Sequence, residues 1–395
     1  MVAPRSLFAL VLSVAILGTL PCAGQLVPGT SASDPALVVT GSDLVVDLST
    51  AGTYDPVHWA VVFHYSSVDV AAGRTVTFLN HPTNAPVVWL VHGDVNIAGT
   101  VNLDGKAGGE PGPGGFRGGR PFSNGSIGPG FGPGGGRVVN PFTGEWGVYG
   151  GGARAYGSDL VIPLLGGSGG GGFGTASGCG GGGAILIAAN GTVTVAGVLR
   201  ARGGPGGGYA ASGGAVRIVA QSVLGSGSIF VRGSSDLGGG GRVALQVSSG
   251  AIAPLAVDLY GGNGTASGTY RTDYLIPEPA IIFPPSDAPT VRVSSVGAMA
   301  GPADPNASWI NPDLAFGTLG PKDVVIETAN LGMPADWDPA DWQVQLFVRP
   351  LNGSEYNVDS VPFTGGNSVF GMWTTSVDLP SGTYTLQARV RRVTP

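Results

Sequence analysis

A unit of about 20 residues that recurs along the chain constrains the fold more than any other feature of the sequence. Each copy contains three short apolar runs, separated by corners that carry glycine, asparagine or serine. Residues 86–105 form the first copy, 183–203 and 214–233 repeat it closely, and 241–260 is a looser copy. A short repeat with three strands per unit is typical of a β-helix.

The apolar residues within each copy occupy alternate positions. Ile185 and Ile187 would share one face of a strand, as would Val193 and Val195. One coil cannot bury this face by itself, whereas stacked coils bury a continuous column of Val, Ile and Leu. The sequence therefore predicts an all-β fold, with a glycine-rich right-handed parallel β-helix, or solenoid, over residues 25–275.

Further strands are predicted ahead of the first copy. One lies in a leader that extends to about residue 60, and two follow the leader. Their β-branched and aromatic residues place them at 36–48, 61–63 and 75–79.

The glycine content predicts long insertions in the solenoid. Glycine supplies 72 and proline 31 of the 395 residues, which favours low complexity, but a hydrophobic fraction of 43% argues against full disorder. The two observations agree if apolar strands alternate with glycine loops at about 105–183, 203–214 and 233–241. All three loops leave the coil at the same corner, so we expect them to stack on one face of the solenoid.

The sequence is compatible with two structures for these loops. They are either disordered linkers or packed extended helices of the polyproline-II type, in which the absence of side chains allows close approach. We predict partial order for 166–214 and weak order for 108–145, where several prolines remove backbone donors.

The C-terminal part has a different pattern. Residues 276–288 form a proline-rich linker, after which conventional strand patterns return over 289–395. This spacing predicts a small β-sandwich of immunoglobulin-like type, without the cysteine pair of antibody domains. The predicted strands are 290–296, 323–328, 342–349, 371–379 and 383–393. Residues 333–342 contain two prolines and are predicted to form a turn rather than a helix.

The N-terminus has the pattern of a secretory signal peptide, residues 1–24. Arg5 precedes an apolar run from Leu7 to Leu20, and small residues allow cleavage before Gln25. Lipidation of Cys22 is a weaker alternative, because Pro21 stands where a small residue is expected. No later stretch is apolar enough to span a membrane. We therefore expect a secreted protein or one on the outer cell surface.

After cleavage Cys179 would be the one remaining cysteine, so no intrachain disulfide is expected. A nucleophilic role would need a nearby base, and all four histidines lie far earlier in the sequence. We interpret Cys179 as a small residue within a glycine run.

Five segments share a glycine-bounded strand pattern with known proteins: 182–197, 213–220, 239–245, 323–332 and 379–388. On these segments the sequence resembles a largely uncharacterised group of exported, glycine-rich bacterial β-helix proteins with a C-terminal immunoglobulin-like sandwich. The resemblance implies a bacterial surface or secreted protein, and it provides no catalytic residues to transfer.

Several ligand classes are disfavoured by composition and context. A net charge of −6 without any basic run argues against nucleic acid. Gly-x-Gly-x-x-Gly strings in 166–183 lack the following helix that a phosphate loop needs. His58, His64, His81 and His92 are interpreted as residues on strand rims rather than as zinc ligands, and no repeated calcium motif is present. We predict no cofactor and no metal.

Carbohydrate is the ligand class with positive indications. Stacked coils would place Arg200 and Arg202 beside Arg232, with Asp258 nearby, and such a ladder can bind anionic sugars. The alternative is an ordinary solvated outer face. A glycosidase needs two carboxylates roughly 5 to 9.5 Å apart, and the sequence shows no such pair. No catalytic residue is therefore predicted.

Trp337 and Trp342 flank a polar turn in the sandwich. They would form either an exposed platform for sugar rings or a turn anchored by its own aromatic residues.

These observations favour a non-enzymatic extracellular or cell-surface protein, a structural or adhesion molecule that contacts an extracellular polysaccharide or another surface component. The runner-up is a β-helix polysaccharide lyase or hydrolase. A third class is a self-assembling structural protein with exposed solenoid ends. The proline-rich residues 276–285 are expected to block the C-terminal end and the leader the other, which disfavours open-ended stacking.

Overall fold

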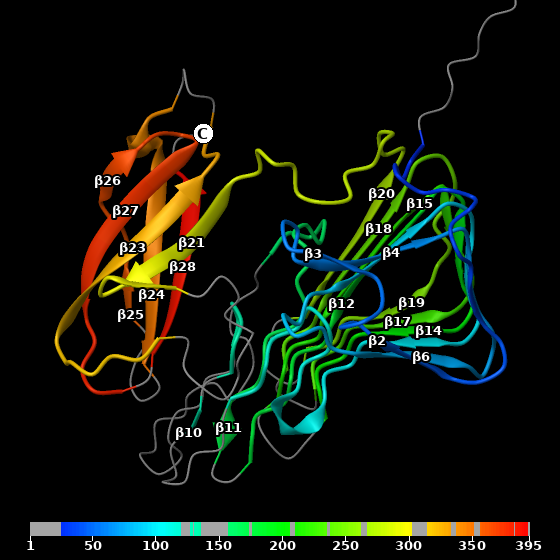
Figure 1. The fold of residues 1–395 in the computed structure, drawn as a ribbon, viewed down its shortest axis with the longest axis horizontal. Helices are drawn as coiled ribbons and strands as arrows, with labels where there is room; N and C mark the ends of the chain where they lie inside the picture. Colours follow the sequence, from blue (N-terminus) through cyan, green and yellow to red (C-terminus); the bar gives the residue numbers. More distant parts are fainter. Residues whose placement is uncertain are drawn as a thin grey trace, which may run out of the picture.

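The computed structural model describes residues 25–119, 127–128, 130–135, 157–173, 176–205, 210–234, 238–261, 267–301, 314–332, 337–350, 356–382 and 384–393. This part of the chain consists of β-strands, loops and two 3-10 turns, Ala107–Gly109 and Pro339–Asp341. A parallel β-solenoid is followed by antiparallel sheets at the C-terminus (Figure 1). The predicted fold class is confirmed.

Three sheets form the walls of the solenoid. Sheet A contains, in spatial order, β1 (Leu37–Val39), β5 (Val68–Val70), β8 (Val95–Ile97), β13 (Thr192–Val195) and β16 (Ser222–Leu224). Sheet B contains β19 (Ala256–Asp258), β17 (Ser228–Phe230), β14 (Val198–Arg200), β9 (Thr100–Asn102), β6 (Thr75–Leu79) and β2 (Leu44–Asp47). Sheet C contains β20 (Thr269–Tyr274), β18 (Arg242–Val247), β15 (Ala215–Ala220), β12 (Ala184–Ala189), β7 (Val87–Val91), β4 (Ala60–Tyr65) and the antiparallel β3 (Thr53–Asp55).

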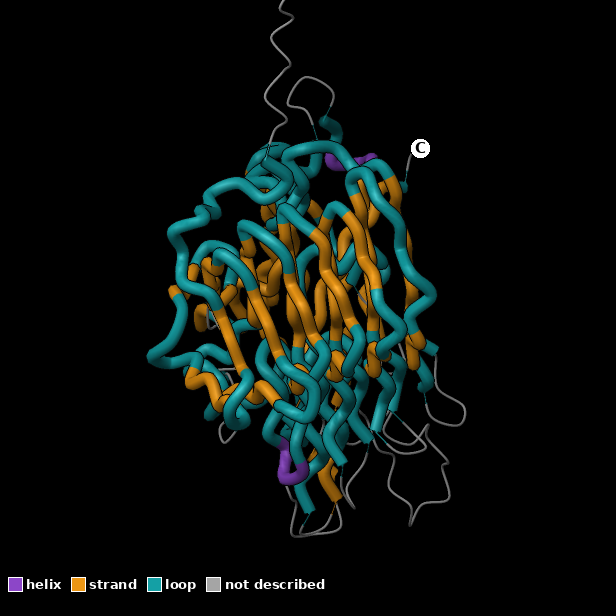
Figure 2. The backbone as a smooth tube through the Cα atoms, turned by 90° about the vertical axis from the view of Figure 1, so that its right-hand side faces the viewer, coloured by secondary structure: helices purple, strands orange, loops and turns teal. Residues whose placement is uncertain are grey.

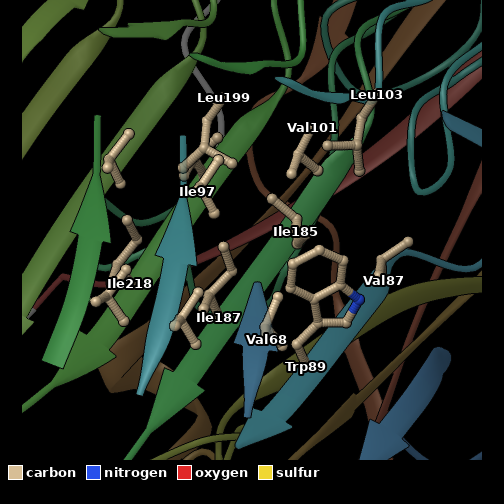
Figure 3. Close-up of a cluster of buried hydrophobic side chains, with 14 of the residues drawn as sticks. Val68, Val87, Trp89, Ile97, Val101, Leu103, Ile185, Ile187, Leu199 and Ile218 are labelled. Carbon is tan, nitrogen blue, oxygen red and sulfur yellow. The ribbon is translucent and has the colours of Figure 1, made fainter. Parts of the chain in front are cut away.

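Successive coils stack in register, and Figure 2 shows their strands side by side. Ile187 of β12 lies opposite Trp89 of β7 on one side and Ile218 of β15 on the other. All three side chains point into the solenoid, where they join one continuous buried cluster (Figure 3). The period-2 alternation in the sequence therefore marks the inner face, as predicted.

The leader forms the first coil, with one difference from the prediction. Residues 36–48 form two strands rather than one, because the chain turns near Gly41 so that β1 joins sheet A and β2 joins sheet B. The predicted strand at 75–79 coincides with β6, and 61–63 lies within β4.

The glycine-rich segments pack against one another beyond the solenoid wall. Consecutive amides of one segment bond to three different neighbours: Gly180 donates to Lys106, Gly181 to Phe116, and Gly182 to Ser212. A β-strand alternates its amides between two sides only, whereas an extended helix with three residues per turn directs them to three. The described glycine segments therefore pack in the polyproline-II manner, the second of the two structures considered above.

The order of these segments differs in part from the prediction. Residues 108–119 are mostly buried and hydrogen-bonded within the bundle, although weak order was expected there. Their glycines let backbones touch, which compensates for the prolines. Residues 120–126, 129 and 136–145, which the same prediction covers, lie outside the described part of the chain.

The proline-rich segment after β20 packs against the outer face of sheet C. Ile276, Ala280, Ile282 and Phe283 join a cluster with outward side chains of sheet C and with Leu26. The expectation that this segment blocks the C-terminal end of the solenoid is therefore wrong. Outward residues of β4, β7, β12 and β15, such as Val62, Leu90 and Val219, are apolar, and their burial favours packing of the segment against this face.

Arg217 of β15 fastens this segment in place. Its guanidinium donates to the carbonyl oxygens of Ile281 (2.5 Å) and Ile282 (2.9 Å) and to the side chain of Gln246 (2.9 Å). Burial lowers the pKa of Arg217 to about 10.

Two antiparallel sheets form the C-terminal sandwich. One contains β22 (Met299–Ala300), β21 (Thr290–Val296), β23 (Pro321–Ala329), β27 (Phe370–Asp378) and β26 (Phe363–Gly366), and the other β25 (Tyr356–Val358), β24 (Trp342–Pro350) and β28 (Tyr384–Arg392). Side chains from both sheets share one buried cluster, which includes Ile326, Val344 and Trp373. The five strands predicted here all occur.

The predicted signal peptide, residues 1–24, lies outside the described residues. Within the described part, no helix is both long and apolar enough to cross a membrane.

Candidate functional site

The three arginines predicted from the sequence lie together on the outer side of sheet B. The strand register places Arg200 beside Asn102 on one side and Phe230 on the other. The same row continues from Phe230 to Asp258. A second row lies just past the strand ends, where the backbones of Gly105, Gly203 and Gly233 bond to Arg202, Arg232 and Tyr260.

We call this surface the arginine ladder, defined by Asn102, Asp104, Arg200, Arg202, Phe230, Arg232, Asp258 and Tyr260. Its members are half-buried or exposed. Each coil contributes two members, which are two residues apart in the sequence. Members of neighbouring coils lie on adjacent strands. The solenoid repeat therefore sets their spacing.

Asp104 organises one end of the ladder. It accepts hydrogen bonds from the Arg202 backbone amide (2.7 Å), Nε (3.1 Å) and Nη2 (2.8 Å). Arg200 Nε lies 3.2 Å from the same carboxylate. The hydrogen bond to Asp104 raises the pKa of Arg202 above its ordinary value. One carboxylate thus holds two guanidinium groups in fixed positions.

The other end of the ladder is looser and carries the aromatic rings. Arg232 Nη1 lies 3.7 Å from Asp258, and its guanidinium carbon lies 5.9 Å from the centre of the Tyr260 ring. Tyr260 is 49% exposed. A guanidinium binds carboxylate or sulfate through paired N–H groups, and an exposed ring supplies an apolar face with a polar tip. The ladder combines both elements on one sheet.

The two carboxylates of the ladder are poorly placed for glycoside hydrolysis. Asp104 belongs to the coil of β9 and Asp258 to β19, with β14 and β17 between them. Three strand spacings amount to about 14 Å, beyond the separation that a glycosidase pair requires.

The two tryptophans lie against the sandwich core. Trp337 is half-buried and meets Phe363 edge-on, with 5.3 Å between the ring centres. Trp342 is also half-buried and begins β24. Their positions favour the anchored turn over the exposed platform, although residues 333–336 of the turn lie outside the described part. Sugar contact at these rings stays a prediction.

His58 and His81 are engaged in local contacts. His58 Nδ1 lies 2.6 Å from Asp55 Oδ2, and its ring stacks on Phe283. His81 stacks on Tyr54 and contacts Thr83. Among the described residues no group of three or more His, Cys, Asp or Glu side chains could hold a metal ion.

Cys179 is expected to be unreactive in the folded protein. It is only 2% exposed, and burial raises the pKa of its thiol, so little thiolate is present near neutral pH. A disulfide reagent such as DTNB should label it at least about a hundredfold more slowly in buffer than in denaturant, because access requires local opening. Equal labelling rates would show that the glycine bundle around Cys179 is open.

Sequence reasoning identified the arginines of the ladder but not Asn102, Phe230 or Tyr260. Aligning the repeats residue by residue would have placed these side chains beside the arginines, because stacked coils keep register. Comparison of the chain with protein-family profiles, curated proteins and solved structures returned no match.

Proposed function

We propose that this chain is a secreted or cell-surface bacterial protein without enzymatic activity, which contacts an acidic polysaccharide through the arginine ladder. The observation that carries the proposal is the stacking of Arg200, Arg202 and Arg232 beside Phe230 and Tyr260 on one exposed sheet. The signal-peptide pattern at residues 1–24 supports export.

The ladder suits a repeating anionic ligand. Its guanidinium groups recur at the coil spacing of about 5 Å, so a chain of acidic sugars lying across the coils would meet several of them. The carboxylates Asp104 and Asp258 hold the side chains in place and leave further N–H groups for a ligand. A guanidinium has five N–H donors, and one carboxylate uses only part of them.

The test is retention of the purified chain on a panel of neutral and acidic polysaccharides, with the same mixtures analysed for new reducing or unsaturated ends. We expect retention by acidic polysaccharides, weakened by salt because exposed charges are screened. Release of products would instead support the lyase or hydrolase alternative.

Arg232→Ala combined with Tyr260→Ala should weaken retention at least about tenfold, a loss near 1.4 kcal/mol. The matched control is Arg292→Ala, which removes an exposed arginine from the sandwich that likewise pairs with a carboxylate, Glu327 (2.8 Å). Retention that responds equally to both changes, or to neither, would contradict a role for the ladder.

A further inference from the structure

Among the described strands the solenoid ends at β20, where its inner column is left uncovered. Tyr270 and Tyr274 lie opposite Val243 and Val247, which are fully buried, yet the two tyrosines are 45% and 57% exposed. In the described part of the chain β20 pairs with β18 alone, so one edge of the strand has no partner strand. At the other end of sheet C, the short antiparallel β3 covers β4.

The free edge presents the backbone groups of three residues. The amide of Thr269 donates to the carbonyl oxygen of Gly241 at 3.0 Å. This bond shows that the backbone groups of Thr269 face β18. Alternate residues of a strand direct their N–H and C=O groups to opposite sides. The backbone of Tyr270, Thr272 and Tyr274 therefore points away from β18, toward the open edge.

A second copy of β20 fits this edge in an antiparallel arrangement. Hydrogen bonding requires an edge-facing residue to lie opposite an edge-facing residue, which leaves registers centred on residue 271, 272 or 273. Centring on Arg271 or on Asp273 places that charged side chain opposite its own copy. Like charges directly opposite each other destabilise a sheet.

Centring on Thr272 places neither Arg271 nor Asp273 opposite its own copy. Arg271 then lies opposite Asp273 of the second copy, Tyr270 lies opposite Tyr274, and Thr272 lies opposite itself. Opposite charges and aromatic pairs both stabilise cross-strand positions. The sequence Tyr-Arg-Thr-Asp-Tyr over 270–274 is thus complementary to itself when the direction of one strand is reversed.

The contacts that Arg271 and Asp273 already make are compatible with this arrangement. Within one chain Arg271 Nε lies 2.9 Å from Asp273, and Nη1 lies 3.0 Å from Asp159. Both charged side chains stand on the outer face of sheet C, opposite in direction to the tyrosines. Two copies would form an alternating cluster of positive and negative groups.

We propose that two copies of this chain form a closed dimer by antiparallel pairing of β20, with the two-fold axis at Thr272. Sheet C then continues from one solenoid into the other, and the exposed tyrosines of the two ends cover each other. A two-fold interface uses the same surface on both copies, so assembly stops at two. This arrangement also protects an edge that would otherwise invite uncontrolled pairing.

The first test measures the mass of the purified chain in solution by light scattering across a dilution series. We expect twice the chain mass, and conversion to monomer in Thr272→Pro. Proline removes an N–H that points to the open edge and is not used for β18, a position that tolerates proline in edge strands. A monomer at about 100 µM, which is within the range of weak interfaces, or an assembly larger than two would overturn the proposal.

The second test uses charge. Asp273→Arg places arginines opposite each other, and Arg271→Asp places aspartates opposite each other, so each variant alone should be monomeric. An equimolar mixture should form dimers, because arginines of one variant then face aspartates of the other. Dimers in either variant alone, or none in the mixture, would overturn the proposed register.

Discussion

Replacing Gly181 by alanine should destabilise the protein by about 3 kcal/mol or more, at the upper end of overpacking effects. A Cβ at this position would lie well under 3.0 Å from the backbone oxygen of Gly167. The neighbouring group is main chain and cannot rotate away. Gly181 also donates to Phe116 and accepts from Gly112, so separating the segments would break these bonds as well.

The measurement is equilibrium unfolding in denaturant, compared with Gly41→Ala as the control. A Cβ on Gly41 would meet nothing within 4 Å, and Gly41 is exposed, so this change should be within about 0.5 kcal/mol of neutral. Similar stability of the two variants would mean that the glycine bundle contributes little to the folded state.

Replacing Trp89 by alanine should cost about 3–5 kcal/mol, the range measured for large aromatic residues in cores. Trp89 is 1% exposed and is the largest fully buried side chain of the described residues. It packs near Tyr65 and Phe78, with ring centres 6.2 and 6.4 Å away. The coils on either side keep their register, so the cavity cannot close without breaking the sheets.

Thermal and denaturant unfolding would both report this loss. Trp89→Phe, which retains most of the apolar volume, should recover much of it, whereas Val57→Ala at an 84% exposed site should have almost no effect. A loss below about 1 kcal/mol for Trp89→Ala would indicate that the interior repacks, contrary to the tight packing expected of a core.

Much of the fold could be predicted from the sequence, because alternation reports directly which face of a strand is buried. Ile185 and Ile187 were assigned to the interior from their spacing and are fully buried there. The strand at 36–48 was predicted wrongly because its apolar residues continue on both sides of a corner. Local pattern does not distinguish one long strand from two that enter different sheets.

The candidate site was only partly predictable. Arg200, Arg202 and Arg232 were found because they lie in copies of the repeat that follow one another closely. Asp104, which holds two of them, is 98 residues from Arg202, across the longest glycine insertion. Tyr260 lies in the loosest copy, where the repeat is hardest to align.

The sequence by itself determined the period of the strands, the three strands of each coil and the need for glycine where segments meet. These properties follow from local chemistry, since a side chain either fits the inner face or does not. Only the tertiary structure decided which glycine segments are neighbours, where the segment at 276–283 packs, and that β20 has an open edge among the described strands. Those outcomes depend on contacts between residues far apart in the chain, which stacking of the coils brings together.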